Sequence, residues 1–316
     1  FFNRKTSDML FELATPLEAG YTSIFTNIGD MVNRGIEIEL NADLIRTKNL
    51  VWDFSLNMTH YKNKLVKLPV QYKNNTTADG KHVGRQQSTK FLTEGESVFS
   101  FYLPTYAGVD QETGKSMWYT YQTDEATGEK KRITTTDYSV ASQEGREMQG
   151  DALPDLYGGF GTSVNFYGFD FSVAFTYQIG GLAYDSGYAA AMYSPANKST
   201  GMNWHKDILK AWSPENASSN IPRLQYEDQN QNGMSDRFLL NASYLNLQNI
   251  NFGYTLPSRI TQKFGVGRIR VYLACENVWY WSKRQGFDPR YSYKGTTSQA
   301  SYSPVRTISG GINLQF

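Results

Sequence analysis

Residues 35–61 read GIEIELNADLIRTKNLVWDFSLNMTHY, and apolar and polar side chains alternate along most of this stretch. Apolar residues occupy every second position across 36–44 and again across 52–58, on either side of the polar link RTKN at 46–49. An alternation of period two places successive side chains on opposite faces of a β-strand. The stretch therefore predicts a hairpin of two long strands with one apolar and one polar face.

Two kinds of protein use such a hairpin. In a soluble β-sandwich, the polar face contacts water and the apolar face contacts the core. In an outer-membrane barrel, the apolar face contacts lipid and the polar face lines a wet lumen. Alternation alone is compatible with both, so other features of the chain have to decide between them.

The composition excludes some classes of protein. The chain has 316 residues and a formal net charge of +1, which gives no bulk electrostatic attraction to nucleic acid or acidic lipid. Its mean hydropathy is negative and no apolar run reaches about 18 residues, so we expect no transmembrane helix. A membrane-spanning β-strand needs only about ten residues, half of them polar. The aromatic content of 15 % suits both sheets and the aromatic girdles of barrels.

The single cysteine and the first residues bear on the cellular compartment. Cys275 is the only cysteine, so an internal disulfide is not expected. The chain begins at Phe1 without an initiator methionine or a signal peptide, and we interpret it as a fragment or a mature piece. The missing targeting sequence is therefore no evidence for a cytoplasmic location.

About ten strands are predicted in all. Along 238–256 the parity changes near Gln248, which predicts a β-bulge. A helix is predicted over 204–212 after the cap Asn203, and a short helical turn within 257–265. The predicted strands span residues 1–13, 35–44, 51–61, 98–109, 115–121, 160–166, 169–179, 238–256, 268–281 and 305–316.

The connections between these strands alternate in length. Those after the odd-numbered strands are long, including 14–34, 63–95 and 180–237, and those after the even-numbered strands are short. Because antiparallel strands alternate in direction, all long connections fall at one end of the sheet. Transmembrane barrels have this asymmetry, with short periplasmic turns and longer extracellular loops. Together with the aromatic C-terminal residue Phe316, it favours an all-β transmembrane barrel over a soluble sandwich.

Several short segments form a series along the whole chain. They are NIGDM at 27–31 with NRGIE at 33–37, YAGVD at 106–110 with TGK at 113–115, PD at 154–155 with GGF at 158–160 and GFDF at 168–171, ASYL at 242–245 with NI at 249–250, GY at 253–254 and LP at 256–257, and Asn277 with GFDP at 286–289. In this order the segments resemble the SusC/RagA family of TonB-dependent outer-membrane transporters from Bacteroidota. The joint order is specific, whereas no single segment is diagnostic.

The resemblance implies a 22-stranded barrel with an N-terminal plug, of which residues 1–316 would form the C-terminal part. The plug and the TonB box have no counterpart in this chain. The resemblance also implies the outer membrane of a Gram-negative bacterium, a SusD-like lipoprotein lid, and coupling to TonB–ExbB–ExbD through the missing N-terminal part. The function would be energy-coupled import of oligosaccharides or peptides. The alternative is a soluble extracellular β-sandwich that binds carbohydrate or mediates adhesion.

In a barrel, the polar residues of the strands face the lumen. Most of them are expected to contact the plug or to hydrate the wall, and not to bind the substrate. The lumen-facing candidates are Glu37, Glu39, Asp53, Asn57, Asp170, Gln178, Arg268, Arg270 and Glu276.

Catalytic motifs are not apparent. The three histidines, His60, His82 and His205, lie on separate segments without an HExxH pair, so neither a zinc site nor a Ser–His–Asp triad is predicted. The segment GVDQETGK at 108–115 has the wrong spacing between its glycines for a P-loop and is interpreted as a turn between strands. We therefore predict that the protein is not an enzyme.

One segment between strands resembles a calcium-binding loop. Residues 228–236, DQNQNGMSD, place oxygen-bearing side chains at alternate positions before a glycine, although Leu239 replaces the glutamate of an EF-hand. The alternative is a polar turn built from residues that tolerate left-handed conformations. The candidate Ca²⁺ ligands are Asp228, Asn230, Asn232 and Asp236.

The predicted helix 204–212 carries the last candidate site. It would place Trp204, Ile208 and Trp212 on one face. The simpler interpretation is that this face packs on the rim of the barrel. The functional interpretation is that the two tryptophans contact a ligand or the lid protein.

Overall fold

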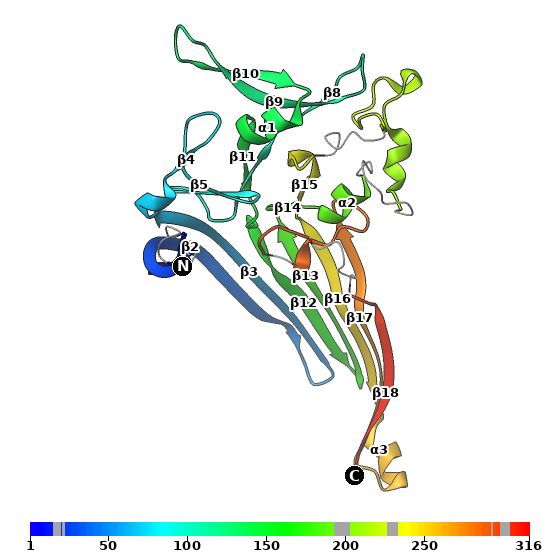
Figure 1. The fold of residues 1–316 in the computed structure, drawn as a ribbon. Helices are drawn as coiled ribbons and strands as arrows, with labels where there is room; N and C mark the ends of the chain where they lie inside the picture. The colour runs from blue at the N-terminus through cyan, green and yellow to red at the C-terminus, as the bar shows by residue number, and fades with distance from the viewer. Residues whose placement is uncertain (15–19, 21–22, 193–202, 226–232, 292, 298–303) are drawn as a thin grey trace.

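The computed structural model describes residues 1–14, 20, 23–192, 203–225, 233–291, 293–297 and 304–316. Its main body is a curved antiparallel sheet of eight strands, in which each strand pairs with the next barrel strand along the chain (Figure 1). In order across the sheet, the strands are β1 (Phe2–Ala14), β2 (Ser23–Arg46), β3 (Leu50–Lys67), β12 (Leu156–Phe166), β13 (Phe169–Ile179), β16 (Tyr244–Thr255), β17 (Arg268–Ser282) and β18 (Thr307–Gln315).

The opening hairpin forms as predicted. Along β2 and β3, Ile38 pairs with Met58 and Leu40 pairs with Leu56, so the apolar side chains of both strands share one face. The backbone N–H of Thr47 donates to the carbonyl oxygen of Leu50 at 2.8 Å and closes the turn. The alternation in residues 35–61 thus predicted both the strands and their pairing.

The second predicted hairpin, β12 with β13, is also confirmed. Phe160 pairs with Phe175, and their rings stack with centroids 4.7 Å apart. The two-residue turn uses Tyr167 at φ +47° and Gly168 at φ +88°. Positive φ at both central residues is typical of a type I′ turn, whose twist matches that of the flanking strands. Glycine adopts positive φ without steric cost.

The strand register assigns the side chains of the sheet to two faces. One row across the apolar face consists of Leu40, Leu56, Phe160, Phe175, Leu247 and Trp279. The adjacent row on the polar face consists of Asn41, Ser55, Gly161, Ala174, Asn249, Glu276 and Thr307. Hydrophobic and polar residues are therefore segregated over the whole width of the sheet.

The apolar face of the sheet remains uncovered within the described residues. Leu40 is 48 % exposed and Phe171 is 38 % exposed, although both lie in the middle of long strands. A β-sandwich would bury such side chains against a second sheet, so the sandwich alternative is wrong. A continuous apolar face of this size requires an apolar environment, which a lipid bilayer provides. In the described part of the chain, no helix is long and apolar enough to cross a membrane.

Aromatic side chains lie toward both ends of the apolar face. Trp279 and Trp281 of β17 are about half exposed near one end, at 47 % and 50 %. Near the other end, the ring of Phe169 lies 4.4 Å from that of Tyr254 and 5.9 Å from that of Phe252. Two such groups have the arrangement of the aromatic girdles at the two interfaces of a membrane barrel.

The predicted bulge near Gln248 is present. The register between β16 and β17 shifts between Leu247 and Asn249. On β17 the irregularity includes Asn277, which has a positive φ of +51°. The parity of β16 changes at this bulge, whereas the odd-numbered residues of β17 stay on the apolar face on both sides of it, so that Trp279 lies beside Leu247.

The structure corrects the number of barrel strands from about ten to eight. The predicted strands 98–109 and 115–121 belong to small sheets beside the barrel sheet. β7 (Ser100–Pro104) has five residues, all buried, so it has no face that could contact lipid. It is also shorter than the roughly ten residues that a spanning strand needs. Its aromatic and apolar residues fill a small core instead.

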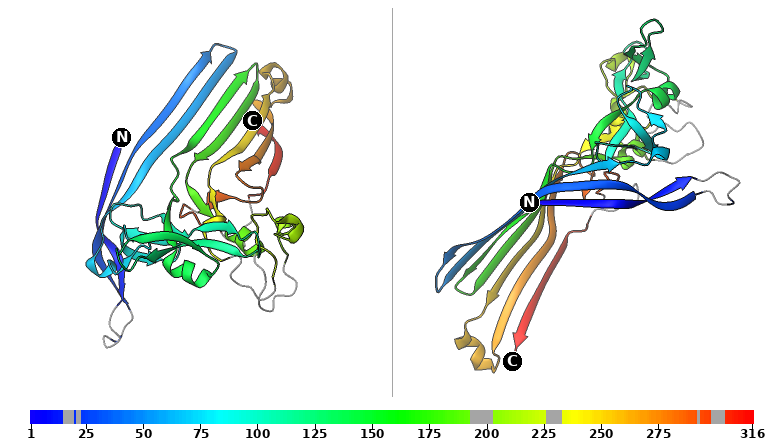
Figure 2. Two further views of the ribbon diagram at one scale, coloured as in Figure 1. Left: turned by 90° about the horizontal axis from the view of Figure 1, so that it is seen from above. Right: turned by 90° about the vertical axis from the view of Figure 1, so that its left-hand side faces the viewer.

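Two predicted loops are partly strand. β2 begins at Ser23, so most of the predicted connection 14–34 is strand. The part of β2 before Asp30 pairs only with β1, and the two strands leave the sheet as a ribbon (Figure 2). β3 continues to Lys67, and short strands occupy part of the predicted loop 63–95. Strand pairing stabilises the ribbon without burying an apolar face. The residues of the ribbon therefore lack a clear alternation of apolar and polar side chains.

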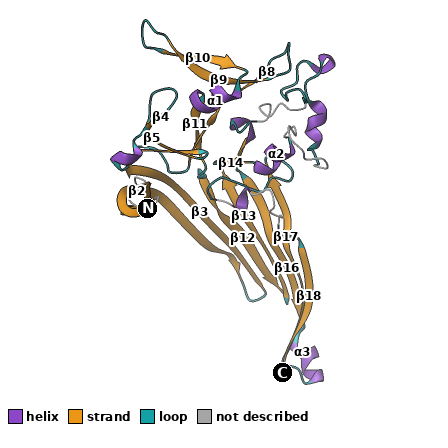
Figure 3. Cartoon of the chain, viewed as in Figure 1, coloured by secondary structure: helices purple, strands orange, loops and turns teal. Residues whose placement is uncertain are grey.

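The segments inserted between barrel strands form small sheets at one end of the main sheet (Figures 1 and 3). One sheet has the order β11-β7-β6-β5-β4, another β10-β9-β8, and the third pairs β14 with β15. Their other strands are β4 (Asn75–Thr76), β5 (Val83–Gln87), β6 (Lys90–Thr93), β8 (Tyr106–Val109), β9 (Ser116–Thr123), β10 (Lys130–Thr135), β11 (Arg146–Asp151), β14 (Leu182–Tyr184) and β15 (Leu239–Asn241).

Helices are short and lie outside the main sheet (Figure 3). The α-helices are α1 (Tyr138–Glu144), α2 (Ser186–Ala191) and α3 (Ser258–Thr261). The 3₁₀-helices span Val70–Tyr72, Lys206–Lys210, Pro214–Asn216, Asp236–Phe238, Gln262–Phe264 and Pro289–Tyr291. We call the end of the main sheet with the small sheets the loop end, and the end with the turns at 47–49, 167–168 and 256–267 the turn end.

Candidate functional site

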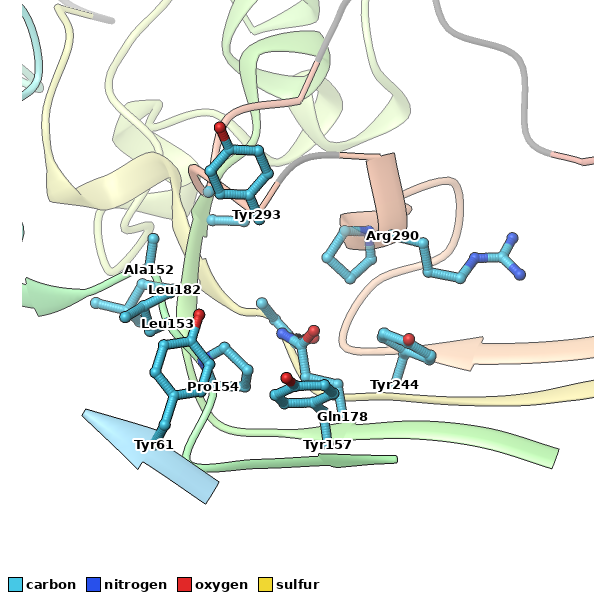
Figure 4. Close-up of a pocket in the computed structure, with 14 residues that line it drawn as sticks. Tyr61, Ala152, Leu153, Pro154, Tyr157, Gln178, Leu182, Tyr244, Arg290 and Tyr293 are labelled. Atoms are coloured by element: carbon cyan, nitrogen blue, oxygen red, sulfur yellow. Dashed lines mark hydrogen bonds between the residues drawn. The ribbon is translucent and has the colours of Figure 1, made fainter. Parts of the chain in front are cut away.

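A cavity of about 280 Å³ lies at the loop end of the polar face (Figure 4). Tyr61 from β3, Tyr157 from β12 and Tyr244 from β16 form much of its wall on the sheet side. On the loop side, Pro154 and Tyr293 complete the wall. We call this space the rim cavity. Its lining combines four tyrosines with few other polar groups.

The strand register places three lining residues of the rim cavity side by side. Tyr157 pairs with Gln178, and Gln178 pairs with Tyr244, so these three residues form one row across the polar face. Tyr61 packs edge-on against Tyr157 with ring centroids 6.2 Å apart. Because interior strands of a sheet cannot shift independently, the positions of these side chains are fixed by the backbone ladder.

The side chains of Gln178 and Arg290 in the rim cavity are engaged with the protein. The Gln178 side-chain amide donates to the carbonyl oxygen of Ala242 at 3.1 Å. Arg290 donates to both carboxylate oxygens of Asp288, at 2.8 and 2.5 Å, and its guanidinium lies 4.3 Å from the centre of the Tyr280 ring. The positive charge of Arg290 is therefore neutralised within the protein. The cavity offers aromatic faces and neutral hydrogen-bonding groups.

The nine residues predicted to face the lumen all have the parity of the polar face. Only Gln178 among them lines the rim cavity. Asp53 accepts a hydrogen bond from the Ser163 hydroxyl at 3.1 Å and borders a shallow hollow of about 340 Å³. Asn57 accepts from the backbone N–H of Gly159 at 2.9 Å. A substrate-binding role of the nine stays a prediction.

An ion pair spans the polar face near the turn end. Arg270 donates to the two carboxylate oxygens of Asp170 at 2.9 and 2.5 Å. Both side chains lie over Gly253 of the intervening strand, where a Cβ atom would come within 2.5 Å of the guanidinium. The glycine thus leaves room for the pair to lie flat on the sheet.

The remaining predicted lumen residues make weaker contacts. Glu39 accepts a hydrogen bond from the Asn41 amide at 3.0 Å. Arg268 lies 3.4 Å from the Thr255 hydroxyl, and Glu276 pairs with Thr307 in the ladder. Glu37 is exposed. These residues are spread along the strands, and the structure does not bring them together into one site.

The predicted helix 204–212 is wrong in length and type. The structure has a 3₁₀-helix over Lys206–Lys210, and its cap is His205, whose ring nitrogen accepts from the backbone N–H of Asp207. The short segment cannot present Trp204 and Trp212 as one helical face. The backbone N–H of Ala211 donates to the carbonyl oxygen of Ile208, three residues earlier, so the segment keeps 3₁₀ hydrogen bonding to its end and stops before Trp212.

Trp212 packs on a turn of the small sheets and not on the barrel rim. Its indole N–H donates to the carbonyl oxygen of Gln111 at 3.2 Å. The ring covers Gly114, where a Cβ atom would lie 2.4 Å from it. Trp204 is 41 % exposed. Trp212 is thus held against this turn, and contact of Trp204 and Trp212 with a ligand or the lid protein stays a prediction.

Three of the four predicted calcium ligands, Asp228, Asn230 and Asn232, lie outside the described residues. Asp236 is described, and its carboxylate accepts a hydrogen bond from the backbone N–H of Tyr106 at 2.7 Å. Burial raises the pKa of Asp236, and this hydrogen bond acts in the opposite direction. A group of three or more acidic, histidine or cysteine side chains that could hold a metal is not found among the described residues. The Ca²⁺ site stays a prediction.

Sequence reasoning missed the tyrosines of the rim cavity. Tyr61 and Tyr244 lie in predicted strands, whereas Tyr157 lies just before the predicted strand 160–166 and Tyr293 lies in a predicted loop. A signal was available, because Tyr61 and Tyr157 share the parity of the polar residues near the loop end of their strands. Tyrosines with the parity of the polar face are therefore the sequence signal that points to this cavity.

Curated relatives match the chain along its whole length. It is 29 % identical to the TonB-dependent receptor P3 of Formosa agariphila over 100 % of the chain. It is 30 % identical to the TonB-dependent receptor SusC of Bacteroides thetaiotaomicron over 99 % of the chain. The chain covers 32 % and 29 % of these two proteins, so it spans about a third of their length. No family model matches the chain.

Solved structures of a transporter share the fold. The structure of the RagAB peptide transporter contains a chain that matches with a TM-score of 0.81 and 26 % identity, over 99 % of this chain and 32 % of that chain. The RagAB peptide importer in its open-open state matches with a TM-score of 0.79 and 25 % identity, over 99 % of this chain and 32 % of that chain. The relatives are receptors and transporters, which confirms that the protein is not an enzyme. The chain therefore belongs with the TonB-dependent receptors of the SusC/RagA family, of whose transmembrane β-barrel it forms the C-terminal part.

Proposed function

We propose that the receptor containing this chain imports a nutrient across the outer membrane, with energy supplied through TonB. The observation that carries the proposal is the eight-stranded sheet, which has one apolar and one polar face and matches a chain of the RagAB peptide transporter. A closed barrel satisfies every backbone hydrogen bond within lipid, and its polar inner face lines a wet path. The chain spans part of its relatives, so the rest of the path belongs to the rest of the receptor.

The orientation follows from the asymmetry of the sheet. The large insertions lie at the loop end and short turns lie at the turn end. In outer-membrane barrels the long loops are extracellular and the short turns are periplasmic. We therefore place the loop end and the rim cavity outside the cell, where a nutrient would first arrive.

The partners of the receptor are part of the proposal. A SusD-like surface lipoprotein would hold the substrate over the loop end, and TonB–ExbB–ExbD would act on a segment outside this chain. The similarity to SusC and to RagAB supports both. The substrate class at this level is an oligosaccharide or a peptide, and RagAB is described as a peptide transporter.

Uptake by cells tests the function. The gene for the full receptor would be deleted and then restored, and uptake of labelled oligosaccharides and oligopeptides would be measured with and without TonB. We expect at least one nutrient to enter only when both the receptor and TonB are present. Uptake that is unchanged by the loss of either would contradict the proposal. Recovery of the receptor as a soluble, detergent-free protein would contradict it as well.

A further inference from the structure

We propose that the rim cavity is a binding subsite for one neutral sugar ring. This inference rests on the proposed import function and names the class of substrate that would use this site. The size of the cavity gives the first support. At about 280 Å³ it lies just below the range of roughly 300–1,000 Å³ that is usual for small-molecule sites. It therefore has room for a single ring of a longer ligand.

The lining offers the two kinds of contact that a sugar ring makes. Tyr61, Tyr157, Tyr244 and Tyr293 each combine an apolar ring face with a polar hydroxyl tip (Figure 4). A pyranose has apolar C–H faces that stack on aromatic rings, and its hydroxyl groups lie around the edge. Tyr157 is 37 % exposed and Tyr293 is 70 % exposed, so both rings have free surface.

The charge of the cavity favours a neutral ligand. Among the described residues, the only charged side chain in the lining is Arg290, and its guanidinium is paired with Asp288 through two hydrogen bonds. A charged group of a ligand would lose its hydration on entering the cavity and would find no free counter-charge in the lining. Burial of an unpaired charge is costly. A neutral polyhydroxylated ring avoids this cost, whereas a charged terminus or side chain of a peptide does not.

The backbone around the cavity offers little to a peptide. Of the strands that contribute lining residues, β14 pairs with β15 on one side and is hydrogen-bonded through Tyr184 to Gly295 and Thr297 on the other. The other four, β3, β12, β13 and β16, all lie in the interior of the main sheet. Their backbone N–H and C=O groups are used in the ladder, so a peptide cannot add as a further strand. Recognition here has to come from side chains, which suits a sugar ring better than a peptide main chain.

The loop that carries Tyr293 is held in place before any ligand binds. The backbone N–H of Tyr184 donates to the carbonyl oxygen of Gly295 at 2.7 Å, and Thr297 donates to the carbonyl oxygen of Tyr184 at 3.2 Å. Gly295 has φ +71°, and a Cβ there would lie 2.5 Å from the carbonyl oxygen of Leu182. Because the wall is already ordered, binding does not have to order it.

The test uses the full receptor purified in detergent, with Tyr157→Ala as the main variant. The probes are neutral hexasaccharides of α-1,4-glucan, β-1,3-glucan, β-1,4-xylan and β-1,4-mannan, and uncharged capped hexapeptides containing phenylalanine or proline. Calorimetry gives the Kd for each. Tyr157→Phe keeps the ring and removes the hydroxyl. Tyr272→Ala is the matched control, since Tyr272 has the same parity but pairs with Gly253 near the turn end. Heat-modifiable migration on gels shows that each variant is folded.

We expect at least one hexasaccharide to bind and Tyr157→Ala to raise its Kd about tenfold, as expected for the loss of one stacking ring. Tyr157→Phe should raise it less, and Tyr272→Ala should leave it within about twofold. Three results would overturn the inference: no hexasaccharide binds, binding is insensitive to Tyr157, or only the peptides bind and lose affinity in Tyr157→Ala. Peptide uptake that depends on the receptor and on TonB would leave the import function standing in each case.

Discussion

Gly158 and Gly310 lie on the same apolar face of the sheet but differ in the space around them. A Cβ atom on Gly158 would lie 2.1 Å from the carbonyl oxygen of Asn57 on β3. A Cβ atom on Gly310 would have its nearest neighbour, the carbonyl oxygen of Tyr272, at an ordinary 3.5 Å. At Gly158 the close neighbour is backbone, which cannot rotate away as a side chain can. The glycine there permits the close approach of β12 to β3.

The alanine variants of these two glycines give a matched prediction. Gly158→Ala should destabilise the barrel by about 1–3 kcal/mol, the usual cost of an extra methyl group in a tight contact. Gly310→Ala should change the stability by less than about 0.5 kcal/mol. Samples would be incubated at increasing temperatures and then run on gels without a boiling step. The measurement is the incubation temperature at which the folded band disappears. Equal temperatures for the two variants would mean that β12 and β3 are not in close contact at Gly158.

Among the elements at the loop end, two small sheets meet at Glu147 of β11. Arg132 of β10 donates to both carboxylate oxygens of Glu147, each at 2.8 Å. Tyr121 of β9 donates to the same carboxylate at 2.7 Å and Thr105 donates at 2.8 Å. Burial raises the pKa of Glu147, but these hydrogen bonds outweigh burial and the net pKa lies below its ordinary value. Burial and Glu147 together raise the pKa of Tyr121 to about 12.

Replacement of Glu147 by glutamine should loosen the link between the sheets. Loss of the charged acceptor is expected to cost on the order of 2 kcal/mol. The pKa of Glu147 is lower in the folded state than in the unfolded state. Its contribution to stability is therefore present above the unfolded-state pKa of about 4.3, and it is lost as the pH falls through the lower folded-state pKa. Glu147→Gln should remove this acid dependence.

Hydrogen exchange of β9 and β10 measures this effect, with β12 of the barrel as an internal reference. Glu129→Gln is the control variant, since Glu129 is an exposed glutamate near the start of β10. Faster exchange in β9 and β10 in Glu147→Gln alone is the expected result. Similar exchange in both variants would show that the Glu147 cluster does not hold the sheets together.

The elements differ in how well the sequence predicts them. Barrel strands such as β3 and β13 carry a strict alternation, because one face contacts only lipid and the other contacts only the wet lumen. β7 carries none, since its five residues are buried on both sides, and its place in a small sheet depends on partners distant in sequence. The ribbon of β1 and β2 depends on pairing between the two strands.

The candidate site shows the same limit. Parity placed Gln178 on the polar face, but the rim cavity also needs Arg290 and Tyr293, which come from a loop between β17 and β18. The position of that loop depends on hydrogen bonds with Tyr184, a residue of a different insertion. Such a contact between two long insertions leaves no periodic signal in the sequence.

On the scale of the whole molecule, the sheet has two edges, β1 and β18, which do not pair with each other in the described residues. Unpaired strand edges are unfavourable in lipid because their backbone groups lack hydrogen-bond partners. The chain also covers only about a third of its relatives. We therefore expect other strands of the receptor to close the barrel beside β1 and β18. The two faces of the sheet would then be separated completely, with lipid outside and water inside.

Site-directed spin labelling of residues 36–40 tests this separation most directly. The full receptor would carry Cys275→Ala together with single cysteines at these positions, and would be placed in lipid bilayers. Labels at Ile36, Ile38 and Leu40 should be accessible to oxygen dissolved in lipid, whereas labels at Glu37 and Glu39 should be shielded from it and more accessible to a water-soluble nickel complex. The account predicts this alternation with a period of two. Labels at Glu37 and Glu39 that contact lipid, or an oxygen accessibility without alternation, would contradict it.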